Sequence, residues 1–211
     1  MLRDVRNAAR NVGSGGCVRL RSALSNLRSY FEQVKPRTIR LCSRLPPIII
    51  LSDAAAEVSG ASLGAVFIDP AMGTYEFFGK RICDEMVKKW KMMGRDQVIC
   101  QAELVAAPLA LATWAAQLAN RDLIFFIDND PAREALIKGA SAATDSARYA
   151  HACRIIGAEC AAACWYARVA SPSNLADHPS RGDLPLLKKA GATWTEPAPL
   201  SCEPELSLFD F

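Results

Sequence analysis

The stretch IIILSDAAAEVSGASLGAVF at residues 48–67 decides the fold that we expect for this chain. Its first four residues form an unbroken apolar run, which is typical of a short strand buried on both faces of a sheet. Residues 61–68 predict a second strand, and residues 74–82 predict a third strand after a turn at 69–73. Three successive strands with short connections predict a meander.

The chain that follows alternates helical patterns with two further apolar strands. An apolar stripe that includes Leu104, Leu111 and Leu118 predicts a long helix. Pro131 at a first helical position and Gly139 after the last one favour a helix between them. The expected elements are a helix at 99–119, a strand at 123–127, helices at 131–138 and 145–164, a strand at 165–169 and a helix at 184–190. This order indicates a mixed α/β fold with one central sheet.

Charge divides the 211 residues into three expected parts. Residues 1–47 hold 10 of the 25 Lys and Arg but 2 of the 22 Asp and Glu, a net charge of +8 against −5 for the remainder. We interpret them as a basic connector with a helix at 17–34, suited either to an anionic partner or to solvation alone. Residues 48–192 form the expected domain. Residues 193–211 are acidic and contain prolines, so we expect a disordered tail.

Several classes of protein are disfavoured. The uncharged stretch between Glu103 and Arg121 is shorter than the ~20 apolar residues of a membrane span. The first 30 residues carry six arginines and no apolar core of a secretory signal, so we expect an intracellular protein, cytoplasmic or nuclear, without a membrane partner. Eight scattered cysteines without a CxxC pair are expected to be buried or free thiols.

Four acids stand where such a sheet would bring them together. Asp53 follows the first buried strand, Glu103 lies in the first turns of the long helix, and Asp128 ends the fourth strand. Asp177 follows the last strand. Strand ends converge at one edge of an α/β sheet, where sites form, and unpaired buried carboxylates are costly.

A cluster of three or four carboxylates suits hard divalent cations such as Mg²⁺. Two ions roughly 3.5–4 Å apart can activate a water and stabilise the leaving oxygen of a phosphodiester. Each acid taken alone has an ordinary interpretation, because Asp53 could be a turn residue, Glu103 a solvated residue, and Asp128 or Asp130 a helix cap.

Four segments together resemble a type 1 ribonuclease H domain, in the version found in retrotransposon reverse transcriptases. They are IIILSDAAAEVSGASLGAVF, QAELVAAPLAL at 101–111, LIFFIDNDPARE at 123–134 and, within SPSNLADHPSRG at 171–182, the most specific piece, SNLADHPSR. The family's acids come in the order Asp, Glu, Asp, Asp, which Asp53, Glu103, Asp128 and Asp177 match one by one. The resemblance covers about residues 46–192, and residues 17–47 are similar to the connection that precedes this domain.

The resemblance implies an RNase H-like fold with a five-stranded mixed sheet, a three-strand antiparallel meander plus two parallel strands, flanked by helices. It implies hydrolysis of the RNA strand of RNA–DNA hybrids with two Mg²⁺ ions, or alternatively Mn²⁺, held by the four acids. Its partners would be the hybrid and the polymerase portion of a reverse transcriptase. Contacts of the hybrid with Gln101, Asn129, Asn174 and Arg181 are further candidates.

The chain departs from this family at two points, of which one is Ala54-Ala55 after the first acid, where Gly-Ser is usual. The loop at 170–173 lacks the histidine of the cellular enzymes, and His178 follows the last acid instead. Two alternatives therefore stay open, a catalytically inactive nucleic-acid-binding remnant and a DNA-cutting nuclease or transposase on the same fold. Gly60 and Gly64 are interpreted as backbone relief rather than as a phosphate loop.

Overall fold

One mixed sheet forms the centre of the protein, in a computed structural model that describes residues 14–33, 45–57, 60–92, 98–141 and 143–199. The strand order is β5-β4-β1-β2-β3-β6. The strands are β1 (Ile48–Glu57), β2 (Gly60–Asp69), β3 (Thr74–Arg81), β4 (Asp122–Ile127), β5 (Ala163–Arg168) and β6 (Thr193–Trp194).

The strand directions confirm the expected sheet. β1, β2 and β3 form an antiparallel meander, and β4 and β5 continue the sheet beyond β1 as parallel strands. This is the five-stranded RNase H-like arrangement that the resemblance implies. The structure adds β6, a strand of two residues that pairs in parallel with β3. The first residues of the expected disordered tail therefore belong to the sheet, which corrects that expectation for Thr193 and Trp194.

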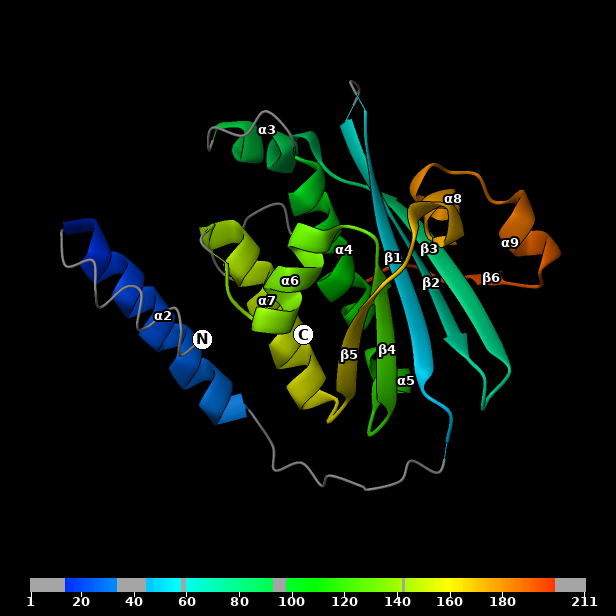
Figure 1. Cartoon of the computed structure of the whole chain (residues 1–211), viewed down its shortest axis with the longest axis horizontal. Coiled ribbons are helices and arrows are strands. Elements are labelled where there is room, and N and C mark those ends of the chain that lie inside the picture. Colours follow the sequence, from blue (N-terminus) through cyan, green and yellow to red (C-terminus); the bar gives the residue numbers. More distant parts are fainter. Residues whose placement is uncertain (1–13, 34–44, 58–59, 93–97, 142, 200–211) are drawn as a thin grey trace.

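Helices cover the two faces of the sheet unequally (Figure 1). The described helices are α2 (Ser14–Gln33), α3 (Asp84–Met92), α4 (Ile99–Thr113), α5 (Ala115–Leu118), α6 (Asp130–Lys138), α7 (Thr144–Glu159), α8 (Asp177–Ser180) and α9 (Pro185–Lys189), with a 3₁₀ turn at Ser171–Ser173. α4 packs on β1 and β2 and is covered in turn by α7, and α2 runs beside α7. On the other face, the short helix α8 contacts β1, β2 and β3.

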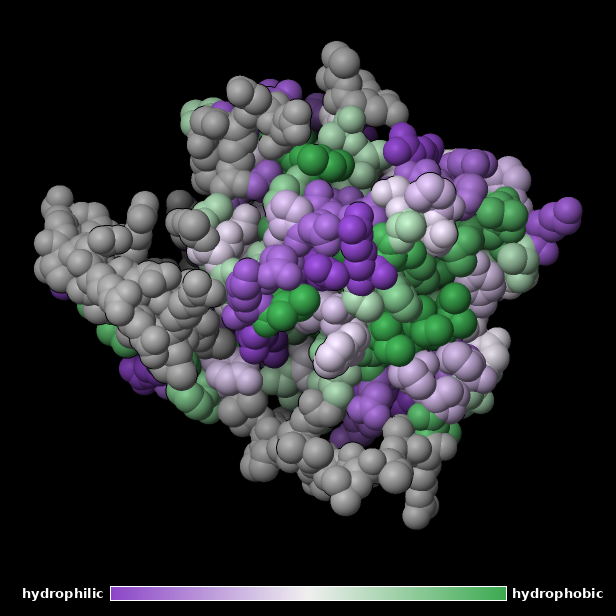
Figure 2. Space-filling view, viewed as in Figure 1, coloured by the Kyte–Doolittle hydropathy of each residue, from purple (hydrophilic) through white to green (hydrophobic). Residues whose placement is uncertain are grey.

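Alternation along β1 divides the core into two clusters. Ile48 and Ile50 point into the large cluster with α4, whereas Leu51 belongs to a smaller one that includes Ala176 and Leu187. Successive side chains of a strand point to opposite faces, so α8 and α9 lie on the face opposite α4. Figure 2 shows hydrophobic surface over the strands beside α8, where this second layer is thin.

The helices differ from the expected ones at several places. The expected helix 145–164 ends at Glu159 as α7, with residues 163 and 164 in β5, and the short helix α8 was not expected. The polar stretch near residue 88 forms α3, which buries Met86, Val87 and Trp90. The expected helix 99–119 is divided at Trp114 into α4 and α5, and Pro108 stays inside α4. Asn129, rather than Asp130, caps α6, because its side chain accepts a hydrogen bond from the backbone N–H of Ala132 at 3.0 Å.

The structure also bears on the expectations for the cysteines and for membrane-spanning helices. Cys100, Cys153, Cys160 and Cys164 are free thiols, as expected. Cys83 is disulfide-bonded, which corrects the expectation for that residue. Among the described residues, no helix combines the length and the apolar character that crossing a membrane requires.

Candidate metal centre

Three acids from different elements meet at the end of β4. One ligand oxygen each from Asp53, Glu103 and Asp128 lies within 4.8 Å of the other two. Asp53 and Glu103 are buried, and Asp128 is half-buried. This spacing lets three carboxylates share one small cation.

The pairing of β1 and β4 explains why the two aspartates meet. β1 pairs in parallel with β4 up to Leu51 and Phe126. Beyond this point β1 continues to Glu57, whereas β4 ends at Ile127 and the chain turns into α6. Asp53 and Asp128 therefore both lie just past the last residues that pair β1 with β4. Asp53 lies inside β1, which corrects the expectation that it follows the first strand.

Glu103 reaches this edge from the helix layer. It lies in the second turn of α4, which packs on β1. Its Oε1 accepts a long hydrogen bond of 3.4 Å from the backbone N–H of Ala54. Its Oε2 is buried without a hydrogen-bond partner, which is costly for a charged oxygen unless a cation binds it.

The electrostatics of the cluster also favour a cation. Burial raises the pKa of Asp53 to about 6, a hydrogen bond from Ser180 opposes this rise, and the charges of Asp128 and Asp177 add to it. Burial, followed by the charges of Asp53 and Asp128, raises the pKa of Glu103 to about 9. A divalent cation would remove this repulsion and restore the ionised carboxylates that hard cations bind.

Asp177 lies outside the group of three acids. It is the first residue of α8, and its Oδ1 accepts a hydrogen bond of 2.7 Å from Nε of Arg181. Its side chain is 42% exposed. Because its charge acts on Asp53, Asp177 still contributes to the field of the same edge.

The other four candidate residues lie in different environments. Gln101 is buried, and Asn129 caps α6. Asn174 is buried and donates to the backbone carbonyl of Ser52 at 3.0 Å. Arg181 is exposed and pairs with Asp177.

Ser180 is the residue at this site that the sequence analysis did not single out. It is buried, and its Oγ lies 2.7 Å from Oδ2 of Asp53. The available signal was its place in the SNLADHPSR segment, three residues after Asp177.

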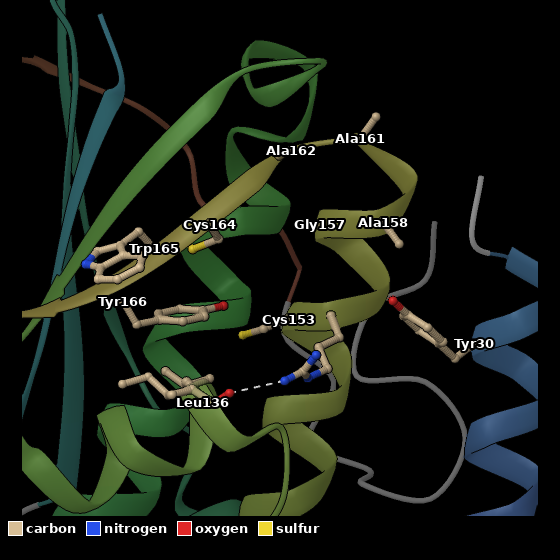
Figure 3. A pocket seen from close by; sticks show the side chains of 12 residues that line it. Tyr30, Leu136, Cys153, Gly157, Ala158, Ala161, Ala162, Cys164, Trp165 and Tyr166 are labelled. Carbon is tan, nitrogen blue, oxygen red and sulfur yellow. Dashed lines mark hydrogen bonds between the residues drawn. The ribbon is translucent and has the colours of Figure 1, made fainter. Parts of the chain in front are cut away.

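A cavity of about 420 Å³ lies elsewhere, between α7, β5, α6 and α2 (Figure 3). Cys153, Cys164 and Tyr166 line it from inside, and Tyr30 of α2 faces it. Burial raises the pKa of the Cys164 thiol to about 12. Since a protonated thiol is a poor nucleophile, this cavity offers no reactive group comparable to the acidic cluster.

No protein-family model matches the chain, and no curated protein sequence matches it. Among solved structures, RNase H1 of the halophilic archaeon Halobacterium salinarum is 18% identical, with a TM-score of 0.47 over 65% of this chain and 96% of that one. The N-terminal RNase H domain of a Mycobacterium tuberculosis protein is 14% identical, with a TM-score of 0.48 over 69% and 98%. A foamy viral protease-reverse transcriptase in complex with RNA/DNA hybrid is 10% identical, with a TM-score of 0.46 over 72% and 22%.

Proposed function

We propose that this chain is a metal-dependent endonuclease that hydrolyses the RNA strand of RNA–DNA hybrids, as the RNase H part of a retroelement reverse transcriptase. The observation that carries the proposal is the approach of Asp53, Glu103 and Asp128 to within 4.8 Å at one sheet edge. The match of the four acids to the family's order supports it. We propose residues 48–192 as the nuclease domain and residues 1–47 as its basic connector.

The donor set fits Mg²⁺ or Mn²⁺. All the candidate ligands are carboxylate oxygens, and the unpartnered Oε2 of Glu103 is an orphaned acceptor. Asp53, Glu103 and Asp128 would hold the ions most directly, and Asp177 would complete the second of two sites. Bound Mg²⁺ supplies a Lewis acid at the phosphoryl oxygen and makes water acidic enough to act as a nucleophile near neutral pH.

The residues of this chain supply position and charge. Asp53 lies within β1 and Asp128 directly after β4, so the sheet fixes the directions from which their carboxylates would hold a cation against a backbone phosphate. Glu103 enters from the helix layer and closes the cluster on its buried side. Selection of a hybrid requires contacts with 2′-hydroxyl groups, which distinguish RNA from DNA.

A cleavage assay on the full chain tests the proposal. Labelled RNA–DNA hybrid, duplex DNA and duplex RNA are incubated with Mg²⁺ or with EDTA. We expect Mg²⁺-dependent cleavage of the RNA strand of the hybrid alone. Cleavage of DNA would instead support another nuclease on this fold, and no cleavage of any substrate would support an inactive remnant.

Asp128→Asn with Asp130→Asn as its matched control identifies the acid that matters. Asp128→Asn keeps the side-chain shape and removes a ligand charge, so cleavage should fall by several orders of magnitude. Asp130 lies two residues on and pairs with Arg133 and Arg168, and its variant should retain activity. Mg²⁺ should also raise the melting temperature of the parent more than that of Asp128→Asn. Equal loss of activity in both variants would contradict the assignment.

A further inference from the structure

Two neutral donors from one segment hold the carboxylate of Asp53. The Oγ of Ser180 lies 2.7 Å from Asp53 Oδ2. Nδ2 of Asn174 lies 3.4 Å from Oδ1, and also donates to the carbonyl of Ser52 at 3.0 Å. Each oxygen of Asp53 therefore faces a donor from residues 174–180, a segment more than 120 positions away in the sequence.

Both donors are buried, and their other polar atoms have partners. Ser180 is 2% exposed and Asn174 is 4% exposed. Oδ1 of Asn174 accepts a hydrogen bond from the backbone N–H of Ala176 at 3.2 Å. Oγ of Ser180 also lies 2.9 Å from the carbonyl of Asp177, but its single hydrogen goes more favourably to the charged carboxylate. Such side chains are too enclosed to contact a nucleic acid strand.

Two glycines in one row with Asp53 allow the segment that carries these donors to approach the sheet closely. Asp53 pairs with Gly64 on β2, and Gly64 pairs with Gly79 on β3. A Cβ atom on Gly64 would lie 2.3 Å from the backbone nitrogen of Ser180, and one on Gly79 would lie 2.4 Å from the carbonyl oxygen of Pro179. The backbone of α8 therefore rests directly on the sheet beside Asp53.

We infer that Ser180 and Asn174 are positioning residues that fix the Asp53 carboxylate before a divalent cation binds. This inference rests on the proposed function, because it assigns a role toward the cation of the same site. The same segment carries Asp177. The packing of α8 on Gly64 and Gly79 therefore fixes the position of Asp177 and also orients the carboxylate of Asp53. Residues that orient metal ligands through hydrogen bonds commonly contribute 10–100-fold to metal affinity.

Ser180→Ala tests this role, and Ser62→Ala is its matched control. Ser62 donates its hydroxyl to the backbone carbonyl of Ser180, so it anchors the same helix without contacting Asp53. Binding of Mg²⁺ and Mn²⁺ to the full chain is measured by titration calorimetry, without substrate. We expect Ser180→Ala to weaken the affinity about tenfold and Ser62→Ala to change it less than about twofold, because only the first loses a donor to the ligand itself.

A second pair of variants separates the hydroxyl from the packing. Ser180→Thr and Ser180→Val have nearly the same shape and share any strain from the added methyl group. The Thr variant should bind the cation more tightly than the Val variant by about tenfold, and Asn174→Ala should weaken binding in the same direction.

The outcomes distinguish this inference from the proposed function. Three results would overturn the positioning role alone. They are equal cation affinity in the parent and Ser180→Ala, equal affinity in Ser180→Thr and Ser180→Val, and equal weakening in Ser180→Ala and Ser62→Ala. A parent chain that binds neither Mg²⁺ nor Mn²⁺ would overturn the metal centre together with the inference. Tight binding by the parent without cleavage of the hybrid would overturn the proposed function and leave the positioning role supported.

Discussion

Glu103→Gln should stabilise the protein in the absence of divalent cations, and the gain should grow as the pH rises. The side chain is buried, its Oε2 has no hydrogen-bond partner, and burial together with Asp53 and Asp128 raises its pKa to about 9. Gln keeps the oxygen that accepts from Ala54 and places a neutral donor near the two aspartates. The substitution therefore removes the titrating group and leaves the shape of the cluster.

The raised pKa sets the sign and the size of the effect. In the unfolded chain this carboxyl ionises near its ordinary value of 4.5, whereas in the folded protein it keeps its proton up to about pH 9. Between these values the folded state binds one more proton, so the free energy of unfolding falls by about 1.4 kcal/mol per pH unit. Over about two pH units, from 6 to 8, the parent should lose up to about 3 kcal/mol relative to Glu103→Gln.

Urea unfolding of both proteins in EDTA, at several pH values in that window, measures this difference. Groups that are common to both proteins contribute equally, so the difference between the two curves isolates residue 103. Mg²⁺ should then stabilise the parent increasingly with pH, because the cation competes with the proton for Glu103, and should stabilise the variant less. Parallel curves in EDTA would refute the argument, since they would mean that Glu103 is ionised in the folded protein.

Three further perturbations address other parts of the molecule. Asp69→Asn should destabilise the protein by about 1–3 kcal/mol, because it weakens a two-point contact of 2.7 and 2.9 Å with the half-buried Arg121, which keeps its hydrogen bond to the backbone carbonyl of Pro46. Arg121 lowers the pKa of Asp69, so the stability that this pair contributes is fully present above the ordinary carboxyl pKa and is lost as the pH falls through the lowered pKa of Asp69. Acid unfolding of the parent and of Asp69→Asn measures this loss. Gly79→Ala should cost about 1–3 kcal/mol in chemical unfolding, because its Cβ would press on Pro179, and an unchanged midpoint would show that α8 shifts freely. Removal of residues 1–44 should weaken hybrid affinity and flatten its salt dependence by about 0.9 in slope per lost phosphate contact, whereas an unchanged slope would identify the basic segment as a linker.

Local patterns were sufficient to predict most of the sheet. The apolar run at 48–51 and the strand that ends at Ile127 each carry their own signal, and acids placed directly after them meet at the edge because the two strands are parallel. α3 escaped prediction because its buried residues stand among lysines, so the polar positions dominate its pattern. Asp130 precedes Pro131 and resembles a cap in sequence, yet Asn129 takes that role because its side chain reaches the N–H of Ala132.

The details of the site depend on contacts that no local pattern encodes. Ser180 and Asp53 are 127 positions apart, and their hydrogen bond exists only because α8 rests on β2 and β3. The glycines that permit this approach are unremarkable in sequence, where Gly64 suggests backbone relief without indicating what approaches it. The strand register places Asp53, Gly64 and Gly79 in one row across the sheet. Only this register shows that the space left by the glycines lies beside an acid of the cluster.

The same row explains how a helix of four residues can place an acid reliably. α8 is too short to hold its position by its own hydrogen bonds, since isolated helices need about three to four turns. Its position is therefore set by the sheet, through the bare backbone at Gly64 and Gly79, where α8 rests directly on β2 and β3. A shift of α8 would move Asp177 and release Asp53 together. The fourth acid is thus coupled to the other three by packing, although it lies outside their group.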